Sequence, residues 1–197
     1  MKLRWVLVAL VLWGAWQHWQ HRPVDTYRTP GITVVAEPVQ TPLETPRQFQ
    51  KAGYQVQTLA GFDIEARVLS VEHYALGRES DLSPVDLALG WGPMSDAGVL
   101  KDISISQGGR FYHWQVEAFP IPREAIETHS ANMHMIPANE EIEERLAHIR
   151  EGQIVHLRGY LVEATAEDGW HWRSSMTRED TGSGACELVW VEAVDAR

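Results

Sequence analysis

The chain carries a single cysteine, Cys186, and a thiol is an intrinsically strong nucleophile once it is ionised. A cysteine hydrolase also needs a histidine that removes the thiol proton, and the candidates for this base are His134 and His129. Cys186 also opens an alternating strand pattern with Leu188 and Trp190, in which a small apolar residue would be buried. The pattern therefore favours a buried, inert thiol, and the pair of Cys186 and His134 is the catalytic alternative.

Asp180 begins the tetrapeptide Asp-Thr-Gly-Ser at residues 180–183, which matches the active-site turn of aspartic proteases. In those enzymes a carboxylate on a tight turn shares a proton with a second carboxylate. Here the polar residues 177–179 precede the tetrapeptide in place of an apolar strand, and the chain has no second copy of it. The context favours a glycine-rich turn in which Asp180 bonds to its own backbone. Asp180 is kept as a third candidate catalytic residue beside Cys186 and His134.

The same two histidines could be considered as metal ligands, but their spacing argues against it. His129 and His134 are five residues apart, which places them on different faces of a helix and on opposite faces of a strand. One cysteine also excludes an intramolecular disulfide and a cysteine-rich zinc site. We therefore expect structural histidines, no metal and no cofactor.

A candidate binding surface lies just before the cysteine. Two tryptophans alternate along a strand and share one face, and a run of small polar residues and glycines follows them up to Glu187. Loops of this composition carry function more often than cores do, and exposed tryptophans would form a platform for a sugar or a peptide. Packing of the tryptophans into the core is the alternative. The candidate binding residues are Trp170, Trp172, Ser174 and Ser175.

The net charge restricts the class of partner. The 197 residues have a formal charge of -10, and most of the acidic excess lies after residue 50. Binding to a phosphate backbone requires clustered lysine and arginine, so a domain this acidic would repel nucleic acid. A basic partner or a cationic ligand would be steered toward it instead.

The N-terminal segment predicts attachment to a membrane. Residues 5–16 are uncharged and mostly apolar, and Gln17 and His18 separate them from Trp19. Lys2 and Arg4 precede the segment, and no small-residue pair marks a cleavage site. As a helix, residues 5–19 span roughly 22 Å at about 1.5 Å per residue, against a hydrocarbon core of roughly 30 Å. Flanking cations and tryptophans can accommodate the mismatch. We expect a transmembrane anchor over residues 1–21 that contacts lipid through residues 5–19, with a cleaved signal peptide or a helix packed on the domain as alternatives.

The rest of the chain divides into a spacer and a domain. Half of the ten prolines lie between His21 and Arg47, which predicts a semi-extended Pro-rich linker over residues 22–50. Residues 51–197 form the acidic domain, and the positive-inside rule places it on the extracytoplasmic side of the membrane.

Apolar periodicity and turn signals predict the elements of the domain. Strands are expected at 54–58, 62–68, 110–118, 154–164, 170–174 and 185–194, and helices at 84–89, 95–101, 122–128 and after Asn139. This order indicates an α+β domain with a mostly antiparallel sheet or a small open barrel, accompanied by short helices and preceded by the N-terminal transmembrane helix.

Three segments of the domain resemble a family of bacterial proteins that have an N-terminal membrane segment and no assigned activity. These segments are SPVDLALGWGPMSD at 83–96, SANMHMIPA at 130–138 and RSSMTREDTGSGACELVWV at 173–191. The resemblance covers most of residues 60–192. It implies a bacterial envelope protein that crosses the inner membrane once, with a periplasmic domain and possible contact with another envelope protein, and it implies no catalytic residue.

The sequence therefore predicts a membrane-anchored binding or accessory module, because the anchor and spacer are clear while no catalytic set is. The rival hypothesis is a Cys/His-dependent hydrolase that acts near the membrane surface.

Overall fold

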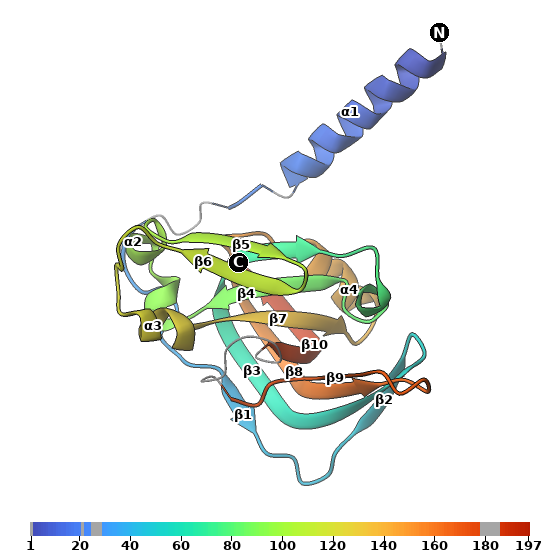
Figure 1. Cartoon of the computed structure of the whole chain (residues 1–197), viewed down its shortest axis with the longest axis vertical. Coiled ribbons are helices and arrows are strands. Elements are labelled where there is room, and N and C mark those ends of the chain that lie inside the picture. Colours follow the sequence, from blue (N-terminus) through green and yellow to red (C-terminus); the bar gives the residue numbers. More distant parts are fainter. Residues whose placement is uncertain (1, 21, 25–28, 178–185) are drawn as a thin grey trace.

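The computed structural model describes residues 2–20, 22–24, 29–177 and 186–197, without the side chains of residues 2, 3 and 16–20. Helix α1 (Lys2–Gln20) extends away from a domain that is built mainly of strands (Figure 1). The side chains of residues 4–15 are exposed, including Trp5 and Trp13 at 70% and 60%. Among the described residues, no helix combines the length and the apolar character needed to cross a membrane. The helix is thus observed, and its anchoring to a membrane stays a prediction.

The domain is organised around one eight-stranded sheet, with β2 paired to β3 beside the strand order β1-β3-β4-β7-β10-β8-β9. Neighbouring strands are antiparallel except for β7 and β10, which run parallel. The sheet strands are β1 (Val39–Thr41), β2 (Gln48–Lys51), β3 (Tyr54–His73), β4 (Val85–Gly90), β7 (Ser130–Pro137), β8 (Ile154–Thr165), β9 (His171–Arg173) and β10 (Glu187–Ala196).

The sheet curls until its pairings return to their starting point. The long strand β3 pairs with β8 along its first part and with β4 along its last part, so that hydrogen bonding continues from β4 through β7, β10 and β8 to β3 again. Strands β1, β2 and β9 extend the sheet outside this circuit, and the sheet is not a true barrel. The α+β class with a mostly antiparallel sheet and short helices is confirmed, whereas the small open barrel is not.

Three predicted elements differ from the structure, and the strands at 39–41, 48–51, 104–108 and 130–137 have no counterpart among the predicted elements. The strands expected at 54–58 and 62–68 are one strand, because a bulge between Thr58 and Ala60 shifts the register against β8 without ending the strand. The helix expected at 84–89 is strand β4, whose six residues are all buried between β3 and β7. A short apolar run has the same appearance in a buried strand as in a buried helix, so its neighbours in the sheet decide the outcome.

The remaining elements agree more closely with the sequence. Asn139 caps α4 by accepting a hydrogen bond from the backbone N–H of Ile142, as its position predicts. Asp96, and not Ser95, caps α2 by accepting from Gly98. The helices and the separate hairpin are η1 (Arg78–Asp81), η2 (Gly92–Ser95), α2 (Ala97–Leu100), β5 (Ser104–Gly108), β6 (Phe111–Gln115), α3 (Arg123–Thr128) and α4 (Glu140–Ala147).

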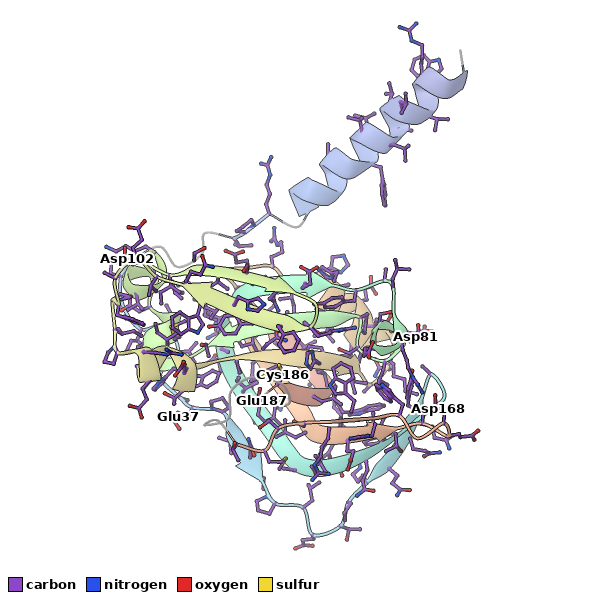
Figure 2. The ribbon with its side chains drawn as sticks, in the orientation of Figure 1. Glu37, Asp81, Asp102, Asp168, Cys186 and Glu187 are labelled. Atoms are coloured by element: carbon purple, nitrogen blue, oxygen red, sulfur yellow. The ribbon has the colours of Figure 1, made fainter. Side chains whose placement is uncertain are left out.

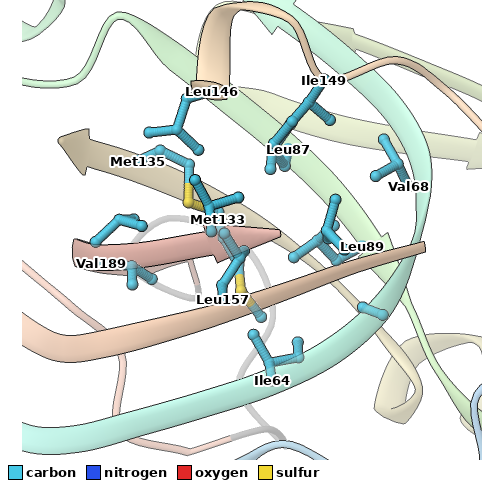
Figure 3. Close-up of a cluster of buried hydrophobic side chains, with 14 of the residues drawn as sticks. Ile64, Val68, Leu87, Leu89, Met133, Met135, Leu146, Ile149, Leu157 and Val189 are labelled. Atoms are coloured by element: carbon cyan, nitrogen blue, oxygen red, sulfur yellow. The ribbon is translucent and has the colours of Figure 1, made fainter. Parts of the chain in front are cut away.

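The main core lies inside the curled sheet and is closed by α4 (Figure 3). Met133 and Met135 of β7 point inward beside Leu157 of β8, and Leu146 of α4 covers them. Because side chains alternate along a strand, His134, which lies between the two methionines, faces the opposite side of the sheet. That outer face, between β9 and the β5–β6 hairpin, is where the polar residues of β4, β7 and β10 gather.

Part of the Pro-rich segment belongs to the folded domain. Strands β1 and β2 pair with β3, and Val34 is buried in the main core with 1% exposure. The hydroxyl oxygen of Ser95 accepts hydrogen bonds from the backbone N–H groups of Thr33 and Val34. These contacts hold residues 33 and 34 against the domain.

Candidate functional site

A pocket of about 560 Å³ opens on the outer face of the sheet. Its floor comes from β7 and the start of β10, one wall comes from β9, and the opposite wall comes from the turn of the β5–β6 hairpin. Both basic and aromatic side chains line it, and the lining residues are Glu79, Arg110, Phe111, His134, Trp170, His171, Trp172, Arg173, Ser174 and Cys186.

Under the floor, Asp86 and His134 face each other across two neighbouring strands. Asp86 of β4 is the register partner of His134 of β7, and their side chains are 0% and 4% exposed. Asp86 Oδ2 and His134 Nδ1 are 3.0 Å apart, although the ring N–H is not aligned for a regular hydrogen bond. The contact is therefore a close electrostatic one that holds the imidazole ring in place.

Arg110 supplies the second partner of the buried carboxylate. Its Nη1 donates to Asp86 Oδ1 at 2.7 Å, and its guanidinium carbon lies 3.7 Å from the ring centroid of Tyr74. The Tyr74 hydroxyl also accepts a hydrogen bond from the backbone N–H of Arg110 at 3.0 Å. Burial raises the pKa of Tyr74, so its hydroxyl stays neutral in this role.

The backbone of Arg110 has the left-handed conformation that glycine usually adopts. Its φ is 71°, and Gly109 before it has a φ of 59°, as a two-residue turn with two positive φ angles requires. A residue with a Cβ atom is strained in this backbone conformation, and such strain persists only where the surrounding contacts enforce it. Here the Asp86, Tyr74 and Asn132 contacts of Arg110 fix the hairpin tip above the sheet.

Cys186 immediately precedes β10, and Figure 2 shows it beside Glu187, the first residue of that strand. It is partly exposed, so the predicted burial of the thiol is wrong. Its Sγ is 3.9 Å from Asn132 Nδ2 and 4.0 Å from the backbone oxygen of Arg110. Gln107 Nε2 donates to Asn132 Oδ1 at 2.7 Å and so orients that amide. Cys186 and His134 therefore line the same pocket, and the contacts of the thiol include Asn132 and the backbone oxygen of Arg110.

The four candidate binding residues divide into two pairs. Trp170 and Trp172 are half-buried on one face of the β9 segment and line the pocket, and the Trp172 ring centroid is 4.6 Å from that of His134. Ser174 also lines the pocket, but its hydroxyl bonds within the chain: its oxygen accepts from the backbone N–H of Leu188. Ser175 is buried, and its backbone N–H donates to the Cys186 carbonyl. The serines thus tie β9 to β10, and the tryptophans face the cavity.

A bidentate ion pair between Arg78 and Asp168 holds the β8–β9 hairpin against η1. Arg78 donates through Nη1 and Nη2 to the Asp168 carboxylate at 2.6 and 2.8 Å, and its guanidinium carbon lies 4.8 Å from the ring centroid of Trp170. Asp168 is at the hairpin tip, well away from Cys186 (Figure 2). The pair positions Trp170 at the rim of the pocket.

The contribution of the Arg78–Asp168 ion pair to stability depends on pH. Hydrogen bonds from Arg78, followed by one from the Trp170 backbone, lower the pKa of Asp168 from 3.8 to about 2. A lowered folded-state pKa means that the contribution is complete above pH 3.8 and is lost as the pH falls through about 2. We expect the difference in unfolding free energy between the native chain and Asp168→Asn, measured in urea, to be small and to shrink over that interval. A difference that stayed constant would contradict this role.

The other candidates lie elsewhere. His129 is at the end of α3, where its Nδ1 is 3.0 Å from the Ala125 carbonyl, and it does not join the lining of the pocket. Asp180 and its tetrapeptide fall within residues 178–185, outside the described residues. Within the described ranges, no cluster of three or more histidine, cysteine, aspartate or glutamate side chains could hold a metal ion.

The sequence interpretation missed Asp86, Arg110 and Asn132, which organise the pocket. One signal was present for Asp86, since it is the single charged residue in the apolar run Val-Asp-Leu-Ala-Leu at 85–89. A carboxylate there is readily placed at the start of a helix, where negative charge is favourable. Read as a strand, the run puts Asp86 on a buried face, where it requires a partner.

Comparisons of the chain with protein-family models, curated proteins and solved structures gave no match. The resemblance to a bacterial family of membrane-attached proteins therefore stays a prediction.

Proposed function

We propose that this chain is a membrane-anchored envelope protein whose domain acts as a binding or accessory module, and that the pocket beside His134 and Cys186 is its ligand site. The observation that carries the proposal is the network of Asp86, Arg110 and His134, which lies at the floor of the pocket of about 560 Å³. A buried ionic network is weak evidence of stability, because desolvation offsets the attraction between its charges. Beside a cavity of ligand size, such a network is typical of a functional site.

The anchor is supported by the exposure of α1. The side chains of residues 5–15 form an uncharged, mostly apolar surface on all sides of the helix, and Trp5, Leu12 and Trp13 are each at least 60% exposed. An apolar surface of this kind is stabilised by lipid or by another protein.

Cell fractionation tests the anchor. We expect the full chain to remain with the membrane pellet after an alkaline carbonate wash, and a chain that lacks residues 2–21 to be soluble. Recovery of the full chain in the soluble fraction, or a mature protein that begins after residue 20, would rule out the anchor.

A hydrolase is the second candidate because of the contact between Asp86 and His134. A carboxylate at Nδ1 orients an imidazole so that Nε2 is free to take a proton from a thiol. His134 Nε2 has no recorded hydrogen-bond partner among the described residues, and it belongs to a side chain that lines the pocket together with Cys186. In this second function Asp86 would be a positioning residue and Cys186 the nucleophile.

The reactivity of Cys186 separates the two functions. We measure alkylation of the native chain by iodoacetamide and compare its rate with that of glutathione at the same pH. The binding module predicts a rate equal to or below that of the free thiol, since this function does not require an ionised thiol. A rate that is much faster than glutathione, and that falls to the glutathione value in His134→Gln, would favour the hydrolase.

A further inference from the structure

We propose that the ligand of this pocket is a small planar molecule that carries an anionic group, with Arg110 as its main anchor. This inference rests on the proposed binding function and adds the chemical class of the ligand. It also sets the pocket apart from the rest of the domain, whose acidic charge predicted a cationic ligand.

The charge of the lining is the first argument. Among the described residues that line the pocket, two are arginines and one, Glu79, is acidic, in a chain with a formal charge of -10. Arg173 is paired with Glu163 and lies on the opposite face of β9 from Trp172, so Arg110 is the arginine that is available to a ligand. Asp86 lies beneath the lining with 0% side-chain exposure, where the ligand does not reach it. Arg110 would therefore complement a carboxylate or a similar anion.

The hydrogen-bonding state of Arg110 is the second argument. Asp86 Oδ1 accepts from Nη1, and no other acceptor for the guanidinium is recorded among the described residues. Nε and Nη2 thus keep donors, on a side chain that lines the pocket and is 17% exposed. The buried carboxylate and the Tyr74 ring hold the guanidinium fork in place, so an anion would meet a donor set that is already oriented.

The aromatic walls supply the planar part of the recognition. Trp172 lies 5.6 Å from the Arg110 guanidinium carbon, Trp170 stands at the rim, and Phe111 is 44% exposed on the opposite wall. Flat ring faces next to a guanidinium favour a ligand with a π system over a flexible aliphatic chain. The volume of about 560 Å³ lies within the range for small-molecule sites.

Three indole compounds of similar size test the inference by isothermal titration calorimetry with the full chain in detergent. Indole-3-acetate is the planar anion, tryptamine is the planar cation and indole-3-acetamide is the neutral compound. We expect indole-3-acetate to bind about tenfold more tightly than either of the others, and to slow the alkylation of Cys186 by iodoacetamide because it fills the same pocket.

Variants locate the anionic preference. Arg110→Lys keeps a cation beside Asp86 but loses the planar fork, and we expect it to bind indole-3-acetate about tenfold more weakly. Arg173→Leu removes an arginine whose side chain is 52% exposed, is paired with Glu163 and lies on the opposite face of β9 from Trp172, so it should fold normally and bind nearly as the native chain does. Arg145→Leu, which removes an exposed arginine paired with Glu141 outside the pocket, should bind as the native chain does.

The outcomes separate the inference from the proposed function. Tight binding of tryptamine or indole-3-acetamide that protects Cys186 from alkylation would overturn the anionic preference and leave the pocket as a binding site. Failure of all three compounds to bind, or binding of indole-3-acetate that Arg110→Lys does not weaken, would overturn the inference itself. The proposed function then depends separately on fractionation and on the reactivity of Cys186.

Discussion

Replacement of Asp86 by alanine is expected to reduce the free energy of unfolding by about 3–5 kcal/mol, as measured by urea denaturation, because it breaks a buried ionic network from one side. The guanidinium of Arg110 and the imidazole of His134 would both lose their acidic partner, at positions that are 17% and 4% exposed. The hairpin tip would also lose the contact that fixes the Arg110 side chain against the sheet. In any fraction of the variant that stays folded, we therefore expect indole-3-acetate to protect Cys186 less well from alkylation by iodoacetamide.

Asp63→Ala is the matched control. Asp63 Oδ1 lies 2.8 Å from His156 Nε2, so this substitution also removes a contact between a carboxylate and a histidine on paired strands. Both side chains are exposed, at 52% and 38%, and an exposed pair contributes about 0–1 kcal/mol. Equal losses in the two variants would show that burial of Asp86 does not set its effect.

Replacement of Gly159 by alanine is expected to cost about 3 kcal/mol or more, because added volume in a packed interior has no space to fill. A Cβ at this position would lie 1.9 Å from the backbone oxygen of Trp190. No side-chain rotation relieves a clash with backbone, so β8 and β10 would have to separate. Since β10 carries Cys186 to the pocket beside β7, we expect the variant to lose pocket geometry as well as thermal stability.

Gly108→Ala tests whether the effect is steric. Gly108 is also a strand glycine, in β5, and a Cβ there would meet nothing within 4 Å. We expect its unfolding free energy to stay within about 0.5 kcal/mol of the native value. A comparable loss in both variants would mean that glycine is needed for reasons other than the approach of β10 to β8.

Local signals in the sequence were sufficient where one short segment determines the structure. Asn139 caps its helix, and Gly169 adopts the positive φ of 89° that the hairpin between β8 and β9 requires. These features depend on residues a few positions apart. The alternation of Trp170 and Trp172 could be predicted for the same reason, and the structure places both on the pocket side of their strand.

The arrangement of the pocket could not be predicted, because its contacts join distant parts of the chain. Asp86 meets Arg110 across 24 residues, and Asn132 meets Cys186 across 54. No periodicity in one segment reports which strand will lie beside it. The same absence of neighbour information makes β4 resemble a helix, in which Asp86 would lie near the helix start instead of on a buried face of the sheet.

The most direct test of the central claim, that Cys186 borders an open and locally basic ligand pocket, uses two alkylating reagents of nearly equal size. Iodoacetate is anionic and iodoacetamide is neutral, so the ratio of their rates at Cys186 reports the local charge with a single reporter thiol. We expect this ratio to be several-fold higher in the native chain than in the same chain unfolded in urea, and to fall toward the unfolded value in Arg110→Gln, which removes the charge that Arg110→Lys keeps. A native ratio equal to or below the unfolded one, or a native thiol that neither reagent reaches, would contradict the claim.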